Sequence, residues 1–254
     1  MTSINRTKQI LSLAERDKPA DVASRILSEL WPDQDCAAIA AGSWRRGEET
    51  ETSDIDMIVL VPEGTPAAMR KSLYRGGWPV EMFVHDRASL EKYMSSDRER
   101  GMPSLMTMIV QGEPVPDSDH PLITHAVNRA NHWLDKQPPA LTDTQIEDRR
   151  YALTDLCDDL AAPKSQDESL AIALRLAPLA GDFYLRANGH WSGEGKSLLR
   201  SLRAANPEQA DLWVQATRAA FLEDSTALQE LAHDWMAPFG GPVFDGYQRG
   251  GKSD

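Results

Sequence analysis

The sequence predicts an α+β fold, in which a small mixed sheet flanked by helices is followed by an all-α helical bundle. Short apolar runs typical of strands occur before about residue 121, whereas later segments repeat apolar residues every three or four positions. The pair Pro138-Pro139 separates these two patterns. A chain of 254 residues is long enough for two domains, so we expect one at 1–138 and a second, helical one at 139–254.

The N-terminal elements follow from local periodicity. Apolar side chains recur at helical spacing from Ile4 to Leu30, with a break at 17–21 where Pro19 suits the first turn of a second helix. We therefore expect two helices, or one kinked helix, before the first strand. In chain order, the patterns then predict a strand at 36–42, a strand at 55–61, a crossing helix at 67–74, a strand at 80–84, a helix at 88–95 and a strand at 106–111.

The C-terminal elements are predicted to be helical throughout. The expected helices span 142–161, 168–187, 195–204, 207–222 and 225–235. The breaks between them fall at Pro163, at Asn188-Gly189 and at Asn206-Pro207, and the glycine-rich tail after Phe239 is expected to be irregular.

Composition excludes several classes of protein. With 27 basic and 39 acidic residues the net charge is −12, which disfavours broad nucleic-acid binding. The most apolar run, 55–61, contains Asp56, so we expect no membrane span, and the N-terminus lacks the apolar core of a signal peptide. Two distant cysteines, Cys36 and Cys157, indicate neither a disulfide framework nor a zinc site. We therefore expect a cytoplasmic protein.

A Gly-Ser pair ends the first predicted strand. At Gly42 the missing side chain lets backbone amides approach an anion, and the hydroxyl of Ser43 adds a further donor. Such a pair alone is most often an ordinary turn. Here we interpret it as a phosphate cradle, because two carboxylates lie eleven and thirteen residues beyond Ser43, at Asp54 and Asp56.

These two carboxylates begin the second predicted strand. Asp54 and Asp56 flank Ile55, and since strand side chains alternate, both project from one face. Adjacent carboxylates repel, and a divalent cation such as magnesium removes that repulsion. Glu81, between apolar neighbours in the next predicted strand, needs a partner and could complete a two-metal site, although alone it would be structural.

These residues resemble the nucleotidyltransferase superfamily of DNA polymerase beta. The resemblance rests on Gly42-Ser43, Gly47, Ser53-Asp54-Ile55-Asp56 and Glu81, and covers roughly residues 20–120. It implies Asp54, Asp56 and Glu81 as catalytic and magnesium-binding residues, for two ions, and Ser43 and Ser53 as contacts of a triphosphate.

The helical half looks most like that of the aminoglycoside nucleotidyltransferases, which move a nucleoside monophosphate from ATP to a drug hydroxyl. The segment from Trp191 to Lys196 is similar to a later motif of that group, which implies that Lys196 reaches the triphosphate. Trp191 could cover a sugar or base, or simply pack. Asp155 and Asp158 could bind a cationic amine or act as the general base, a role for which Glu81 competes, or belong to a solvated helix face.

The resulting hypothesis is a magnesium-dependent enzyme that transfers AMP from ATP, or a related nucleotide, to a small hydroxylated acceptor. An aminoglycoside-type antibiotic is the leading candidate for the acceptor. We expect neither nucleic acid nor a membrane as a partner. Two alternatives stay open. One is a nucleotide-binding regulatory or antitoxin-like protein that acts through a protein partner, and the other is an enzyme that modifies protein side chains. The sequence leaves the acceptor, the nucleotide base, the general base and the oligomeric state undecided.

Overall fold

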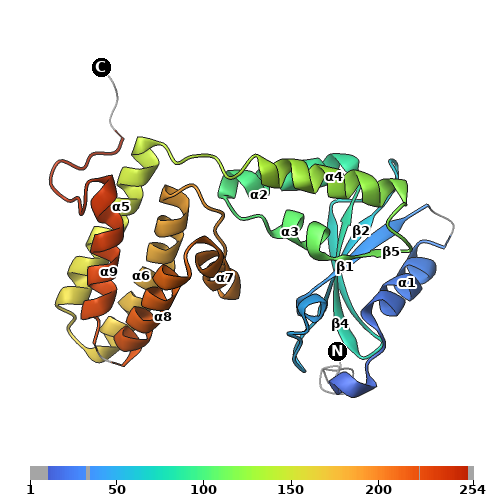
Figure 1. The fold of residues 1–254 in the computed structure, drawn as a ribbon, viewed down its shortest axis with the longest axis horizontal. Coiled ribbons are helices and arrows are strands. Elements are labelled where there is room, and N and C mark those ends of the chain that lie inside the picture. The colour runs from blue at the N-terminus through green and yellow to red at the C-terminus, as the bar shows by residue number, and fades with distance from the viewer. Residues whose placement is uncertain (1–10, 33–34, 223, 251–254) are drawn as a thin grey trace. The chain divides into compact units, whose positions relative to one another are not determined.

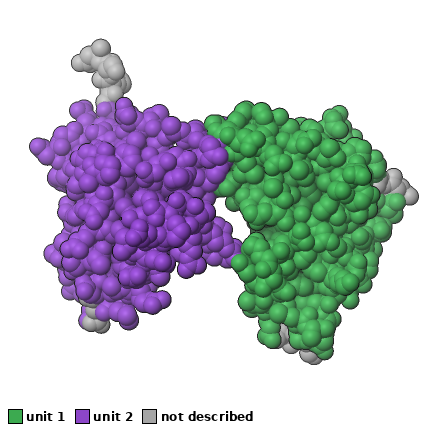
Figure 2. All heavy atoms as spheres, viewed as in Figure 1, with its two compact units in different colours: residues 1–98, 103–136 green, residues 99–102, 137–254 purple. Residues whose placement is uncertain are grey.

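The computed structural model describes residues 11–32, 35–222 and 224–250 (Figure 1). The chain divides into two compact units: unit 1 comprises 1–98 and 103–136, and unit 2 comprises 99–102 and 137–254 (Figure 2). The helix predicted from Ile4 falls partly outside the described residues, as do the last four residues of the tail. The described part of this predicted helix, 11–16, is not α-helical and forms only a short 3₁₀ helix, so the prediction was wrong there.

The chain as far as residue 136 alternates between strands and helices. It forms, in order, η2 (Leu13–Glu15), α1 (Pro19–Leu30), β1 (Ala37–Ala41), η3 (Ser43–Arg46), β2 (Ile55–Leu60), β3 (Met69–Arg75), β4 (Trp78–His85), α2 (Arg87–Arg100), α3 (Ser104–Gln111), β5 (Glu113–Val115) and α4 (Pro121–Asp135). Pro19 occupies the first turn of α1, where its missing N–H would have no helical partner.

The sheet of unit 1 is mixed. Among the described residues it has five strands in the order β3-β4-β2-β1-β5, with β2 and β4 parallel and the other neighbours antiparallel. Helix α1 packs on the face that carries Ala38, Ile55 and Met57, while α3 and α4 cover the opposite face beside Ile39 (Figure 1). The predicted α+β class is therefore confirmed.

Two further predicted elements were wrong. The segment 67–74 forms strand β3 instead of a helix, because Gly76 and Gly77, with φ of +58° and +82°, close a two-residue hairpin onto β4. The segment 106–111 forms most of helix α3 instead of a strand, with Leu105, Met106 and Ile109 buried on one side. An apolar run this short does not distinguish the two by periodicity. Strand β5 and helix α4 were not predicted.

The helices of unit 2 follow the predicted pattern closely. They are α5 (Asp143–Ala161), α6 (Gln166–Ala187), α7 (Lys196–Ala205), α8 (Pro207–Phe221) and α9 (Thr226–Met236), followed by η4 (Ala237–Phe239). Their starts are set by side chains that accept backbone N–H groups: Thr142 in a capping box with Gln145, Ser165 before α6, and Asn206 before α8.

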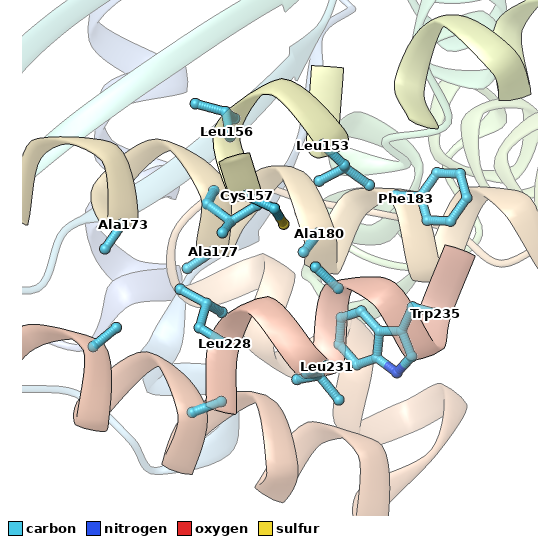
Figure 3. Close-up of a cluster of buried hydrophobic side chains, with 14 of the residues drawn as sticks. Leu153, Leu156, Cys157, Ala173, Ala177, Ala180, Phe183, Leu228, Leu231 and Trp235 are labelled. Atoms are coloured by element: carbon cyan, nitrogen blue, oxygen red, sulfur yellow. The ribbon is translucent and has the colours of Figure 1, made fainter. Parts of the chain in front are cut away.

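The five α-helices described in unit 2, α5 to α9, all contribute buried residues to its core. Leu153 and Cys157 of α5 lie against the small residues of α6 and the apolar face of α9, with Phe183 and Trp235 filling one end (Figure 3). Because this stripe of α5 is buried, Asp155 is exposed to solvent, as are the two aspartates one turn later. Among the described helices, none is both long and apolar enough to cross a membrane.

Candidate functional site

The loop after β1 depends on a glycine. Gly42 adopts φ +136° and ψ −179°, a conformation open essentially to glycine alone. A Cβ at this position would lie 3.0 Å from the backbone oxygen of Asp54 and 2.9 Å from Cδ1 of Trp44. Gly42 therefore allows the end of β1 to lie directly against the backbone of the residue that begins the acidic motif.

The two predicted serines meet at this loop. The hydroxyls of Ser43 and Ser53 are 2.9 Å apart, and the amide of Thr50 donates to Oγ of Ser53 at 2.9 Å. The indole N–H of Trp44 donates to the carbonyl of Ala41 at 2.9 Å. These bonds close the loop between β1 and β2, so that both hydroxyls lie beside the start of β2.

An arginine that sequence reasoning missed supports this loop. Arg16 donates from Nη1 to the carbonyl of Ser53 at 3.2 Å and from Nη2 to the carbonyl of Glu51. Its guanidinium also lies 4.5 Å from the ring centre of Trp78. Burial lowers the pKa of Arg16, against the opposing effect of Glu51. Nothing in the local sequence pattern singles out this residue.

The acidic pair lies where the sequence predicted. Asp54 is exposed and comes directly before β2, Asp56 is half-buried within it, and Ile55 between them is fully buried under α1. Since side chains alternate along a strand, both carboxylates belong to the face opposite α1.

The parallel pairing of β2 and β4 brings the third carboxylate to the same place. Asp56 and Glu81 are register partners, so their side chains are neighbours on one face of the sheet. We expected a metal ion as the partner that Glu81 needs. Instead Arg70 donates from Nε to Oε1 of Glu81 at 2.6 Å, and its Nη2 forms an ion pair with the same oxygen.

Arg70 was not predicted because its segment was assigned to a helix. In strand β3, Arg70 pairs with Phe83 and Ser72 with Glu81, which makes Arg70 a diagonal neighbour of Glu81. The guanidinium also lies 5.2 Å from the ring centre of Phe83. The Gly-Gly dipeptide at 76–77 was the signal that could have indicated the hairpin and hence this pair.

The residue types fit a magnesium site, with one qualification that concerns Glu81. Carboxylate oxygens are the ligands that Mg²⁺ prefers, and Asp54 and Asp56 provide them two residues apart. Among the described residues no group of three His, Cys, Asp or Glu side chains is placed to hold a metal ion. Glu81 has the right register for a third ligand, but its carboxylate is engaged by Arg70.

A separate apolar cavity of about 320 Å³ lies in unit 1, away from this motif. It is lined by residues of β1, α3, α4 and the segments that flank β5: Ile39, Ile109, Val110, Gly112, Pro114, Ser118, Ile123, Thr124, Val127 and Asn128. The glycine, serines and carboxylates of the motif are not among these residues.

The remaining candidates belong to unit 2. Lys196 is the exposed first residue of α7 and follows Gly195, whose φ is +52°. Trp191 is half-buried, whereas Asp155 and Asp158 are exposed on α5. The structure therefore places the predicted residues in two groups, one in each unit: the motif of unit 1, whose members it brings together, and this second group.

Residues 21–100 match the family model described as "Nucleotidyltransferase domain". This part of unit 1 is therefore similar to a nucleotidyltransferase domain. The match includes the Gly42-Ser43 loop, both aspartates and Glu81, so the predicted resemblance to the nucleotidyltransferase superfamily is confirmed at this level.

Similarity beyond this domain is weak. One solved structure, the crystal structure of a nucleotidyltransferase-like protein from Exiguobacterium sibiricum 255-15, is 11% identical and has a TM-score of 0.43. The comparison covers 87% of this chain and 77% of that one, but a score this low does not establish a shared arrangement. No curated protein shows significant similarity to the sequence.

Proposed function

We propose that this nucleotidyltransferase domain transfers a nucleoside monophosphate, AMP from ATP, to a hydroxyl of a small molecule and releases pyrophosphate. The observation that carries the proposal is the register of Asp56 with Glu81, beside the paired hydroxyls of Ser43 and Ser53. The carboxylates of Asp54 and Asp56 would serve as cation ligands, Glu81 has the register of a third, and the two hydroxyls can donate hydrogen bonds to a phosphate.

The proposed reaction is an in-line displacement at the α-phosphorus. The acceptor oxygen forms a new P–O bond, the bond between the α-phosphorus and the oxygen that bridges to the β-phosphate breaks, and pyrophosphate leaves. The hydroxyl proton passes to a carboxylate base, for which Glu81 and the aspartates of α5 are the candidates. Magnesium, when bound, would neutralise charge on the phosphates.

Each motif residue then has an assigned role. Asp54 and Asp56 hold the cation, and Glu81 completes its coordination or serves as the base. The backbone at Gly42 and the hydroxyls of Ser43 and Ser53 hold the triphosphate. Lys196 is proposed as a further triphosphate contact on the basis of the family resemblance.

The proposed acceptor is a cationic, hydroxylated small molecule of the aminoglycoside type. Support comes from the exposed carboxylates of Asp155 and Asp158, which suit ammonium groups, and from Trp191, whose half-buried ring could cover a sugar. The net charge of −12 would also favour encounter with a polycation.

The test is pyrophosphate release from ATP and from GTP with Mg²⁺, across cationic aminoglycosides, neutral hydroxylated antibiotics and no acceptor. The proposal expects release that requires both an acceptor and the metal ion and stops with a chelator. Absence of acceptor-dependent release, together with a stable complex with a protein partner, would support the regulatory alternative instead.

The role of Lys196 is tested separately. Lys196→Ala should raise KM for ATP, whereas Arg203→Ala, which removes an exposed cation near the other end of α7, should leave KM unchanged. Equal KM values in the two variants would remove Lys196 from the proposed site.

A further inference from the structure

Arg70 binds a carboxylate of the acidic motif. Its Nε donates to Oε1 of Glu81 at 2.6 Å, and its Nη2 forms an ion pair with the same oxygen. Glu81 is the register partner of Asp56, so the guanidinium sits beside the strand positions from which a metal ion would be held.

The electrostatics explain why a cation belongs at this position. Asp54, Asp56 and Glu81 carry three negative charges on adjoining strand positions, and like charges on one sheet face destabilise each other. The guanidinium of Arg70 offsets part of that repulsion. A divalent cation would do so more completely and would compete for the same carboxylate oxygens.

The geometry indicates that the contact between Arg70 and Glu81 can be broken. The side chain of Arg70 is 65% exposed and that of Glu81 only 23%, so the arginine can move into solvent while the carboxylate stays at the site. An exposed ion pair and one cation–π contact, here with Phe83, are each weak. Arg70 can therefore hold Glu81 without trapping it.

We propose that Arg70 competes with the divalent cation for Glu81, so that Glu81 becomes a metal ligand only when Arg70 releases it. The inference rests on the proposed function, because it assumes that Asp54 and Asp56 bind a cation. It assigns Arg70 a role as a positioning residue, which stabilises the metal-free protein and lowers its affinity for the ion.

The test measures binding of Mn²⁺ by electron paramagnetic resonance without nucleotide or acceptor, so that activity plays no part. Arg70→Gln should bind Mn²⁺ roughly three- to tenfold more tightly than the wild type, the gain expected when a weak ion pair and a cation–π contact no longer oppose binding. Arg70→Lys keeps the charge but loses the Nε donor and the planar guanidinium, and its Mn²⁺ affinity should lie in between.

The matched control is Lys71→Gln. Lys71 is the exposed next residue of β3 and pairs with Met82, on the other face of the strand, so its removal changes the net charge equally. If Lys71→Gln tightens Mn²⁺ binding as much as Arg70→Gln does, the effect is general electrostatics and the proposal is wrong.

A second variant isolates Glu81. In a Glu81→Gln background, Arg70→Gln should no longer change the Mn²⁺ affinity, because the carboxylate for which Arg70 and Mn²⁺ compete is absent. Persistence of the full gain in that background would overturn the proposal, as would absence of Mn²⁺ binding to both the wild type and Arg70→Gln. These outcomes are distinct from failure of the proposed function, which is read from pyrophosphate release.

Thermal unfolding provides an independent measurement on the same variants. Without divalent ions Arg70→Gln should unfold at a lower temperature than the wild type, because the carboxylate of Glu81 then loses its ion pair with the guanidinium of Arg70. Saturating Mn²⁺ should raise the unfolding temperature of Arg70→Gln by more than that of the wild type. An equal shift in the two proteins would contradict competition.

Discussion

Gly42 offers a direct test of how the loop after β1 is built. Replacing it by alanine forces a Cβ into a conformation that costs roughly 1–3 kcal/mol for any other residue. The same atom would lie 3.0 Å from the backbone oxygen of Asp54, which cannot rotate away, and overpacking of this kind costs about 1–3 kcal/mol more. We therefore expect Gly42→Ala to destabilise unit 1 by about 2–6 kcal/mol.

The matched control is Gly64→Ala in the same unit. Gly64 also has a positive φ, +87°, but a Cβ there would meet nothing within 4 Å, so only the backbone penalty of about 1–2 kcal/mol applies. By differential scanning calorimetry the unit 1 transition of Gly42→Ala should fall clearly below that of Gly64→Ala, since each kcal/mol lowers Tm by roughly 2–8 °C. Equal Tm values in the two variants would refute the close approach of Gly42 and Asp54.

Two further predictions concern buried titratable groups. Burial lowers the pKa of His85 below its ordinary value of 6.5, so the unfolded state takes up a proton first and the protein loses stability as pH falls below 6.5. Between about pH 7.5 and about pH 5.5, the free energy of unfolding in urea should therefore fall more steeply in the wild type than in His85→Asn, and parallel pH dependences in the two proteins would contradict this. Burial raises the pKa of Cys157 to about 12. At about pH 8 a disulfide reagent should therefore label the half-buried Cys36 first and Cys157 only after unfolding, and equal labelling rates for the two thiols would contradict this.

The sequence was sufficient to predict the parts of the site that local patterns encode. Alternation placed Asp54 and Asp56 on one face because Ile55 between them had to be buried, and the apolar stripe of α5 predicted which aspartates would be exposed. The strand that carries Glu81 was also predicted from its apolar neighbours. Its pairing with Asp56 is a long-range contact that no single segment encodes, and the sequence indicated it only through the partner that Glu81 needs and through the family resemblance.

The features that escaped prediction depend on pairings that single segments do not encode. The segment around Arg70 was assigned to a helix, so its contact with Glu81 across a hairpin was lost, although Gly76-Gly77 marks the turn. Arg16 reaches carbonyl groups more than thirty residues away, for which no local pattern exists. Helix α3 was misassigned because it is short and five of its eight residues are apolar, a pattern that fits a buried strand equally well.

The central claim is nucleotidyl transfer by the acidic motif of unit 1. The most direct measurement follows label from ATP carrying radioactive phosphorus at either the α or the γ position, with Mg²⁺ and an accepted substrate. We predict that the α label is transferred to the acceptor and that the γ label is released in pyrophosphate. In Asp56→Asn the rates of transfer and of pyrophosphate release should each fall more than roughly a hundredfold, while Tm is unchanged. Transfer of γ label to the acceptor, or full activity in Asp56→Asn, would contradict it.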